Sequence, residues 1–222
     1  MCFSATASFV TAAMTGAVGL VAMTRARDRR ALPLAAAPLV FGVQQGIEGL
    51  LWLHLSAAPT GAMTSALAFL FLVVALVLWP VYAPVAVLLV EPGERRRRLM
   101  RLCLAVGGGV SAYMLWWILT RPPAAVIADG HIVYVTGLGH AAAIAPAYLV
   151  ATSLPLLSSS RRSVVALGGI VAAGSVVAYG FYWEAFVSVW CFFAAAASLA
   201  ILGHFEHAHR RRQRLAAAGM AA

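Results

Sequence analysis

The sequence contains no lysine and no asparagine, so all sixteen of its basic residues are arginine. Without lysine, the chain cannot form a Schiff base with retinal or use a lysine nucleophile. It also cannot build the Gly-Lys-Ser/Thr end of a phosphate-binding loop, so we expect neither retinal nor a nucleotide as cofactor. The three cysteines, Cys2, Cys103 and Cys191, show no Cys-x-x-Cys spacing, which excludes the common zinc-ribbon and thioredoxin signatures and a disulfide scaffold.

Charged residues are scarce as well. Of the 222 residues, 63% are hydrophobic and only 10% are charged, and the mean hydropathy is +0.89. Soluble domains carry roughly 25% charged residues, so the composition predicts a multi-pass protein of the inner or plasma membrane. A net charge of +9 and a pI of about 10.5 are also typical of nucleic-acid-binding proteins, but the positions of the arginines indicate another role.

Charged clusters divide the chain into seven apolar segments, each close to the length of about 20 residues that a membrane-spanning helix needs. The predicted spans cover residues 4–24, 32–54, 63–89, 99–120, 139–157, 163–183 and 185–204. The sequence therefore predicts an all-α, seven-helix transmembrane bundle that forms a single domain over residues 1–209. A basic cytoplasmic tail over residues 210–222 follows it.

The arginines predict the orientation of this bundle. Fifteen of the sixteen lie in alternate loops and in the tail, at 25–30, 95–101, 161–162 and 210–214, and only Arg121 lies at the opposite side. Because arginine near helix ends favours the cytoplasmic side, we expect the N-terminus outside and the C-terminus in the cytoplasm. The expected partner of the arginines is the anionic headgroup layer of the bilayer, and not nucleic acid.

Prolines and glycines indicate irregular points in the bundle. Pro80 and Pro84 are expected to kink or break the third span, and Gly107, Gly108 and Gly109 are expected to let a neighbouring helix approach the fourth span closely. Asp129-Gly130 lies between two β-prone runs, which predicts a small β-hairpin at about 124–135, over the outer mouth of the bundle. An isolated hairpin is marginally stable, so it has to pack on another element.

Glu48 is the one clear ionisable residue inside a predicted span, and such residues mark functional sites by default. Gln44, Glu48 and Trp52 share one face of the helix, with Gln45 beside them. A buried carboxylate costs several kcal/mol unless it is paired, so we favour a functional role for Glu48. On the first span, hydroxyl side chains form a second polar stripe at Ser4, Ser8, Thr11 and Thr15. For this stripe we favour hydrogen bonding that holds helices together.

The predicted orientation collects several metal-binding residue types at the outer surface. These are Cys2, His54, Asp129, His131, His140 and Glu184. Such a set contains enough ligands for a zinc or copper ion, which needs about three or four. The alternatives are interfacial histidines and, for Asp129, a turn residue. At the opposite face, His204, His207 and His209 precede the last arginine cluster, and we favour a headgroup-binding helix end there over a metal site.

The opening string Met1-Cys2-Phe3-Ser4-Ala5-Thr6-Ala7-Ser8-Phe9, with Phe41 to Gly49 and Trp52, resembles a family of uncharacterised bacterial multi-pass membrane proteins that begin in the same way. The resemblance covers the whole chain and implies an integral membrane protein without an assigned activity. The seven-helix ceramidase and progestin-receptor-like hydrolases offer an analogy, but their paired His-x-x-x-His on the seventh helix is absent.

Two functional hypotheses follow from the sequence. In the first, an outward-facing polar pocket around Glu48, lined by Gln44, Gln45, Trp52, Ser4, Ser8 and Glu184, binds a metal or small ligand and hydrolyses a lipid or amphiphile. Glu48 is then a base or ligand, and Cys2, His54, His131 and His140 are ligands or proton carriers. In the second, the protein is a non-enzymatic transporter, sensor or assembly partner in which Glu48 couples to a proton or cation.

Overall fold

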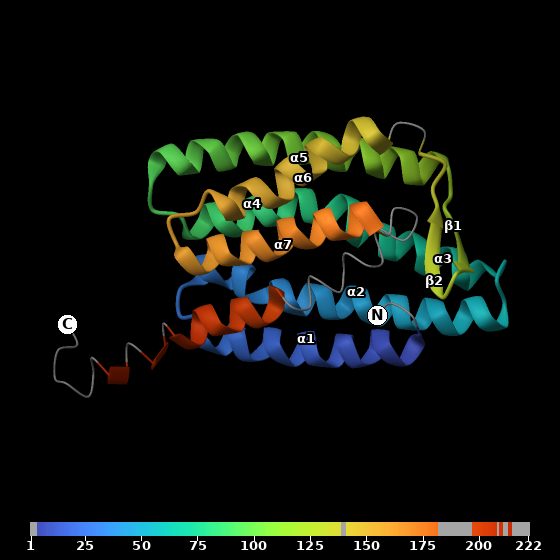
Figure 1. Cartoon of the computed structure of the whole chain (residues 1–222), viewed down its shortest axis with the longest axis horizontal. Coiled ribbons are helices and arrows are strands. Elements are labelled where there is room, and N and C mark those ends of the chain that lie inside the picture. The colour runs from blue at the N-terminus through green and yellow to red at the C-terminus, as the bar shows by residue number, and fades with distance from the viewer. Residues whose placement is uncertain (1–3, 139–140, 182–196, 208, 211–212, 215–222) are drawn as a thin grey trace.

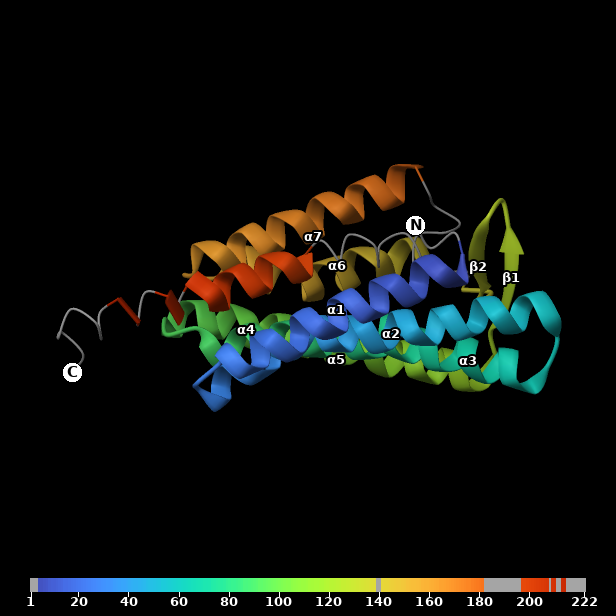
Figure 2. The same cartoon turned by 90° about the horizontal axis from the view of Figure 1, so that it is seen from below.

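The computed structural model describes residues 4–138, 141–181, 197–207, 209–210 and 213–214 (Figure 1). The elements are α1 (Ala5–Arg25), η1 (Arg29–Ala31), α2 (Leu32–Ala57), α3 (Ala62–Leu72), η2 (Val73–Leu78), α4 (Trp79–Val90), α5 (Glu94–Thr120), β1 (Ala124–Ala128), β2 (His131–Val135), α6 (Ala141–Leu157) and α7 (Arg162–Phe181). Residues 197–207 form a further helical segment. The helices lie side by side along the long axis, with the two strands at one end (Figures 1 and 2).

The helical class predicted from the sequence is confirmed, but the bundle of seven spans is not. Among the described residues, four helices are long and apolar enough to cross a membrane: Ala5–Arg25, Arg29–Ala57, Ala62–Val90 and Glu94–Thr120. Shorter apolar helices cover Ala143–Leu157 and Arg162–Val177. Most of the predicted seventh span, 185–204, lies outside the described residues.

The prolines of the third apolar segment do not break its helix, which continues through α3, η2 and α4. Instead, η2 is a short π-helix that ends at Leu78, two residues before Pro80. Because Pro80 has no N–H, it cannot donate a backbone hydrogen bond to the carbonyl of Ala75, five residues earlier. The hydroxyl of Tyr148 donates to that carbonyl at 2.6 Å, and the hydroxyl of Ser111 donates to the carbonyl of Val77 at 2.6 Å. Side chains of α5 and α6 therefore satisfy carbonyl groups where this helix is irregular.

Gly107 is the member of the glycine triplet that allows close helix contact. Pro84 has no N–H for the carbonyl of Pro80, and α5 passes so close to this carbonyl that a Cβ atom at Gly107 would collide with it. Gly108 and Gly109 have nothing within 4 Å of the position of a Cβ atom. The predicted close approach is confirmed for the first of the three positions.

Glycine also brings α1 and α2 into close antiparallel contact. A Cβ atom at Gly19 would collide with the backbone of Leu39, and one at Gly49 would lie 2.9 Å from the ring of Phe9. Small residues therefore allow the two backbones to approach, as they do in membrane helix pairs.

The predicted β-hairpin is confirmed. β1 pairs antiparallel with β2 in a register that places Ala128 opposite His131, and the two turn residues have φ of 48° at Asp129 and 73° at Gly130. Positive φ at both positions is what a two-residue turn of this type requires. Ile132 is fully buried in a cluster with residues of α2 and α3, and Tyr134 stacks on Phe71 with ring centroids 4.7 Å apart. The hairpin thus packs on these two helices.

We predict that Gly107→Ala lowers stability by about 1–3 kcal/mol, because the added methyl group forces α5 away from α4. Gly108→Ala is the matched control in the same helix turn, and it should be neutral or stabilising by roughly 0.5–1 kcal/mol, since alanine favours the helix. Thermal unfolding of the purified variants in detergent measures both. Equal melting temperatures of the two variants would contradict the close contact.

Candidate functional site

Glu48, Gln45 and Gln44 form hydrogen bonds within α2 and between α2 and α4. Glu48 is fully buried, and Gln45 donates from Nε2 to its Oε2 at 3.1 Å. Gln44 is also fully buried and accepts a hydrogen bond from Nε1 of Trp79 at 2.9 Å. The ring of Trp79 stacks on Phe41, with centroids 3.9 Å apart. The predicted polar face is therefore buried, and its amide groups contribute to helix packing.

The hydroxyl stripe on α1 mostly bonds to its own helix, and these bonds do not join it to another helix. Ser4 is the N-cap and accepts a hydrogen bond from the N–H of Ala7 at 3.2 Å. Thr11 donates to the carbonyl of Ala7 at 2.9 Å, and Thr15 donates to that of Thr11 at 2.8 Å. Ser8 is fully buried, and its hydroxyl has no partner within the described residues.

The predicted outer metal site is not assembled by the residues that the structure describes. Cys2, His140, Glu184 and Cys191 lie outside them. His54 lies in the last turn of α2 and His131 begins β2, where burial lowers the pKa of its imidazole despite the opposing charge of Asp129. Within the described ranges, no group of three or more His, Cys, Asp or Glu residues is placed to hold a metal ion. Metal binding and hydrolysis at Glu48 stay predictions of the sequence.

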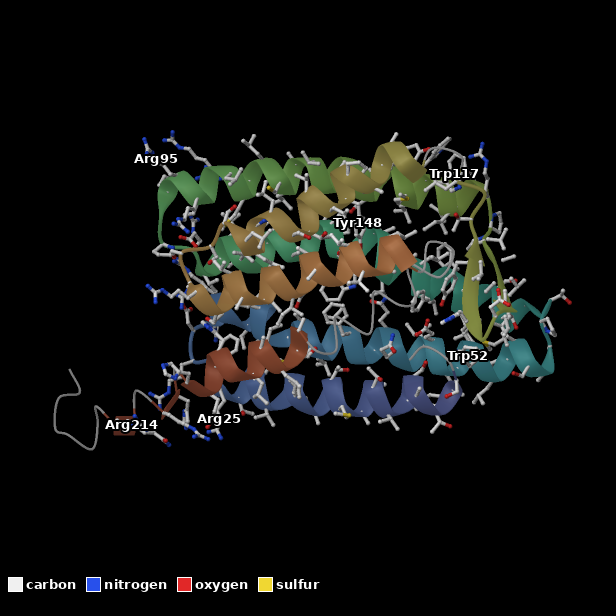
Figure 3. All side chains as sticks on the ribbon, viewed as in Figure 1. Arg25, Trp52, Arg95, Trp117, Tyr148 and Arg214 are labelled. Atoms are coloured by element: carbon white, nitrogen blue, oxygen red, sulfur yellow. The ribbon has the colours of Figure 1, made fainter. Side chains whose placement is uncertain are left out.

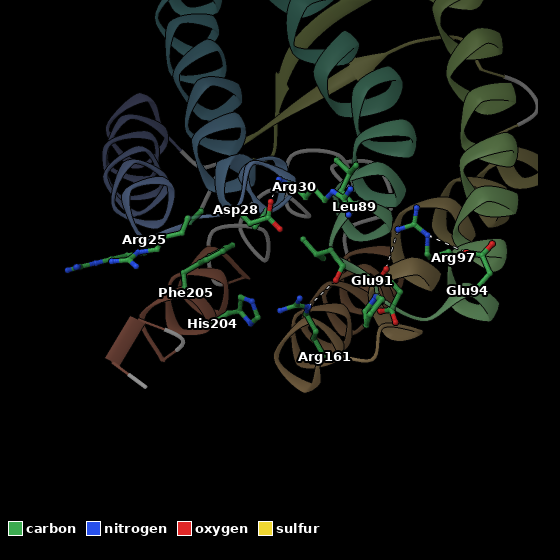
Figure 4. Close-up of a pocket in the computed structure, with 15 residues that line it drawn as sticks. Arg25, Asp28, Arg30, Leu89, Glu91, Glu94, Arg97, Arg161, His204 and Phe205 are labelled. Carbon is green, nitrogen blue, oxygen red and sulfur yellow. Dashed lines mark hydrogen bonds and ion pairs between the residues drawn. The ribbon is translucent and has the colours of Figure 1, made fainter. Parts of the chain in front are cut away.

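A cavity of about 480 Å³, which we name the basic pocket, opens at the arginine-rich end of the bundle (Figure 4). It lies between the end of α1, η1, the α4–α5 and α6–α7 turns, and the helical segment 197–207. Its basic lining residues are Arg25, Arg27, Arg30, Arg97, Arg161 and His204. Its acidic lining residues are Asp28, Glu91 and Glu94. Figure 3 shows other arginines, including Arg95 and Arg214, at the same end, far from Trp52 and Trp117.

Glu91 joins two turns that border the basic pocket. It is 2% exposed, and its Oε2 accepts hydrogen bonds from the N–H of Ser160 at 2.8 Å and the hydroxyl of Ser159 at 3.1 Å. Burial alone would raise the pKa of this carboxyl, but these bonds and the N–H of Gly93 outweigh burial and lower it below the ordinary value. Glu91 is therefore an ionised clamp between the α4–α5 and α6–α7 turns.

Arginines of the same turns bond to the free carbonyl groups at helix ends. Arg97 donates to the carbonyl of Leu88 at 3.0 Å. Arg161 donates from Nε to the carbonyl of Val90 at 3.2 Å. The last carbonyls of a helix have no partner within it and carry its negative dipole end, so cationic donors stabilise them. Part of the arginine excess thus has a structural role as well as the predicted topological one.

The acidic residues of the pocket are already engaged. Asp28 accepts from the N–H of Arg30 at 2.9 Å as the cap of η1. Glu94 pairs with Arg97, Arg98 and Arg101. The guanidinium groups of Arg27 and Arg30 form no ion pair within the described part of the chain, and in Figure 4 Arg30 and Arg161 approach the pocket from opposite sides. The cavity therefore presents cationic donors to a negatively charged group.

The helical segment 197–207 forms one wall of the basic pocket and lies between α1 and α7 (Figures 1 and 2). Arg25 pairs with Glu206 at 3.4 Å and donates from Nη1 to Nε2 of His209 at 2.9 Å. Ser163 shares a hydrogen bond with Nδ1 of His204. The sequence predicted a headgroup-binding helix end here, and the structure brings its first histidine to the pocket.

Glu91 and Arg161 were treated in the sequence only as part of the charge balance. A usable signal was present for Glu91, which stands between the last apolar residue of a predicted span and the turn residues Pro92 and Gly93. A carboxylate at such a position can accept the free N–H groups of a turn. Its partners Ser159 and Ser160 are too far away in sequence to be inferred.

The fold and the pocket define a helical protein whose described part contains four helices that could cross a membrane and a basic cavity at one end of the bundle. The chain belongs to the family of unknown function DUF6629, whose model matches residues 1–218. This confirms the resemblance to an uncharacterised family that the opening string indicated. No curated protein and no solved structure matches the chain.

We predict that Glu91→Gln lowers stability at neutral pH by about 1–3 kcal/mol, because one charge-assisted acceptor of a buried bond network is lost. Since the folded-state pKa lies below the ordinary value of 4.5, the contribution of Glu91 is present above that pH and is lost as the pH falls through the folded-state pKa. The difference from wild type, measured by thermal unfolding in detergent, should shrink below pH 4.5.

The control for this measurement is Glu94→Gln, which removes an exposed carboxylate from the same turn. Its surface pairs are worth roughly 0–1 kcal/mol, so its melting temperature should stay close to that of the wild type at neutral pH. If Glu91→Gln lowers the melting temperature, relative to the wild type, by the same amount at neutral and at acidic pH, Glu91 is not an ionised clamp.

Proposed function

We propose that this chain is an integral membrane protein that binds the phosphate-bearing headgroup of an anionic lipid in the basic pocket. The observation that carries the proposal is a cavity of about 480 Å³ lined by five arginines, of which Arg27, Arg30 and Arg161 form no ion pair within the described residues. Guanidinium groups donate in a planar fork that matches phosphate oxygens, and they stay charged at any physiological pH.

Apolar side chains on the outside of the bundle support membrane insertion. They are exposed on each of the long helices, for example at Val10, Met14, Val43, Leu53, Leu70, Leu102 and Leu119. In water, such a continuous apolar surface is unfavourable, whereas in a bilayer it contacts acyl chains. The basic pocket then lies at the level of the headgroups, because it opens where α1, α4 and α6 end.

The arginine distribution supports an orientation with this end in the cytoplasm, where the leaflet surface is negative. We predict that a fluorescent protein fused after Ala222 will fold and fluoresce, and that a periplasmic phosphatase fused there will be inactive. The same phosphatase inserted in the hairpin turn at Gly130 should be active, because the hairpin lies at the opposite end of the bundle. An active phosphatase at the C-terminal fusion point would overturn the orientation.

We predict that Arg30→Gln and Arg161→Gln each weaken the binding of a short-chain phosphatidic acid roughly tenfold, since a charge-assisted hydrogen bond contributes about 1.5–3 kcal/mol. Titration of the purified protein in an uncharged detergent measures the affinity. Short-chain phosphatidylcholine should bind far more weakly, and inorganic phosphate should compete, which separates the headgroup contribution from that of the chains.

Arg98→Gln is the matched control, because Arg98 lies at the same end of the bundle, is exposed, and does not line the basic pocket. Its affinity for phosphatidic acid should equal that of the wild type. If all three variants bind equally well, or if phosphatidylcholine binds as tightly as phosphatidic acid, the basic pocket is not a headgroup site.

A further inference from the structure

We propose that the lipid bound in the basic pocket places an acyl chain inside the helix bundle, along an apolar crevice that leads away from the pocket. The inference rests on the proposed function and specifies it: the ligand is an anionic lipid held between helices, and not one that touches only the outside of the bundle.

The apolar crevice lies between α2, α4, α6, α7 and the helical segment 197–207. Its lining residues are Leu34, Ala37, Phe41, Trp79, Tyr82, Ala83, Ala86, Thr152, Leu156, Leu167, Val171, Ala197 and Ile201. Leu34 and Phe41 lie about two helical turns apart, so the crevice extends roughly 10 Å along α2. Alanines on α2, α4 and the 197–207 segment leave the space that larger side chains would fill.

The three polar side chains in this lining turn their polar atoms away from the crevice. Trp79 donates to Gln44 at 2.9 Å, Tyr82 donates to the carbonyl of Pro33 at 2.6 Å, and Thr152 donates to the carbonyl of Tyr148 at 2.9 Å. The surface of the crevice is accordingly apolar throughout. A water molecule needs two to four polar partners in a cavity, so an apolar occupant fits this crevice better than water does.

A narrow cavity lies between the crevice and the basic pocket and is lined by residues of both. It shares Leu34, Leu167 and Ile201 with the crevice, and it shares His204 with the pocket. Its volume is only about 10 Å³ and that of the crevice about 50 Å³. The side chains of Ile201 and His204 therefore have to move for a chain to pass, and the crevice suits a thin flexible chain and not a ring system.

The order of these cavities follows the chemistry of an anionic lipid. Arginines surround the space at the end of the helices, and apolar side chains surround the space one to two turns further in. A headgroup held by Arg30 and Arg161 has its ester-linked chain directed toward His204 and Ile201. The basic pocket favours a lipid with a negatively charged headgroup, and the crevice accepts the acyl chain of the same lipid.

The experiment uses the full chain reconstituted in phosphatidylcholine vesicles with a phosphatidic acid that carries a diazirine on its acyl chain. After irradiation, adducts are mapped by mass spectrometry of peptides. We expect adducts on α2 around Ala37 and on the 197–207 segment around Ala197. In Ala86→Leu, which fills the crevice, these adducts should fall roughly tenfold, as expected from the cost of overpacking.

Ala105→Leu is the control, because it makes the same substitution at an exposed position of α5. It should leave the adducts unchanged. Ala83→Leu is a second blocking variant at a half-buried position of the lining, for use if Ala86→Leu unfolds. In both blocking variants, competition by inorganic phosphate at the basic pocket should persist.

The outcomes separate this inference from the proposed function. Crevice adducts that disappear in the blocking variants, while headgroup binding persists, support it. Adducts confined to outward-facing residues such as Leu102 and Leu119, with binding that still depends on Arg30 and Arg161, overturn it but leave the headgroup site intact. Adducts that do not depend on these arginines overturn both.

Discussion

Backbone groups in long apolar helices must find their hydrogen bonds within the protein, and the rest of this structure depends on that constraint. Within the third apolar segment, Pro80 cannot donate a backbone hydrogen bond to the carbonyl of Ala75, and the hydroxyl of Tyr148 of α6 donates to it. At the arginine-rich end, Arg97 and Arg161 donate to the last carbonyls of α4. Side chains that satisfy one helix therefore fix the position of its neighbours.

The same constraint explains why the basic pocket exists as a cavity. Glu91 accepts hydrogen bonds from the α6–α7 turn and holds it against the α4–α5 turn. The basic pocket is bordered on its other side by η1 and the 197–207 segment. Arg30 and Arg161 lie on opposite sides of it. The ionised carboxylate of Glu91 thus sets the geometry of the basic pocket by joining the two turns. Its negative charge is balanced by hydrogen-bond donors of these turns and does not neutralise the arginines of the pocket.

Local patterns predicted local structure well. Asp129 and Gly130 adopt the positive φ values that the hairpin requires, since a two-residue turn depends only on adjacent residues. The buried face of Gln44, Glu48 and Trp52 also follows from helical spacing alone. The third span was expected to kink or break at its prolines, and the structure shows a continuous helix with a π-helical turn and donors from α5 and α6 beside them. Those donors are distant in sequence.

The sequence by itself determined the helical class, the apolar segments, the hairpin and the segregation of arginine to one end, because each depends on composition or short-range spacing. Only the tertiary structure decided which arginines surround a cavity and which bond to helix ends. It also decided that Glu91 acts with Ser159 and Ser160, and that Trp79, Tyr82 and Thr152 turn their polar atoms away from one crevice. These relations join residues from different helices, and no spacing in the sequence encodes which faces meet.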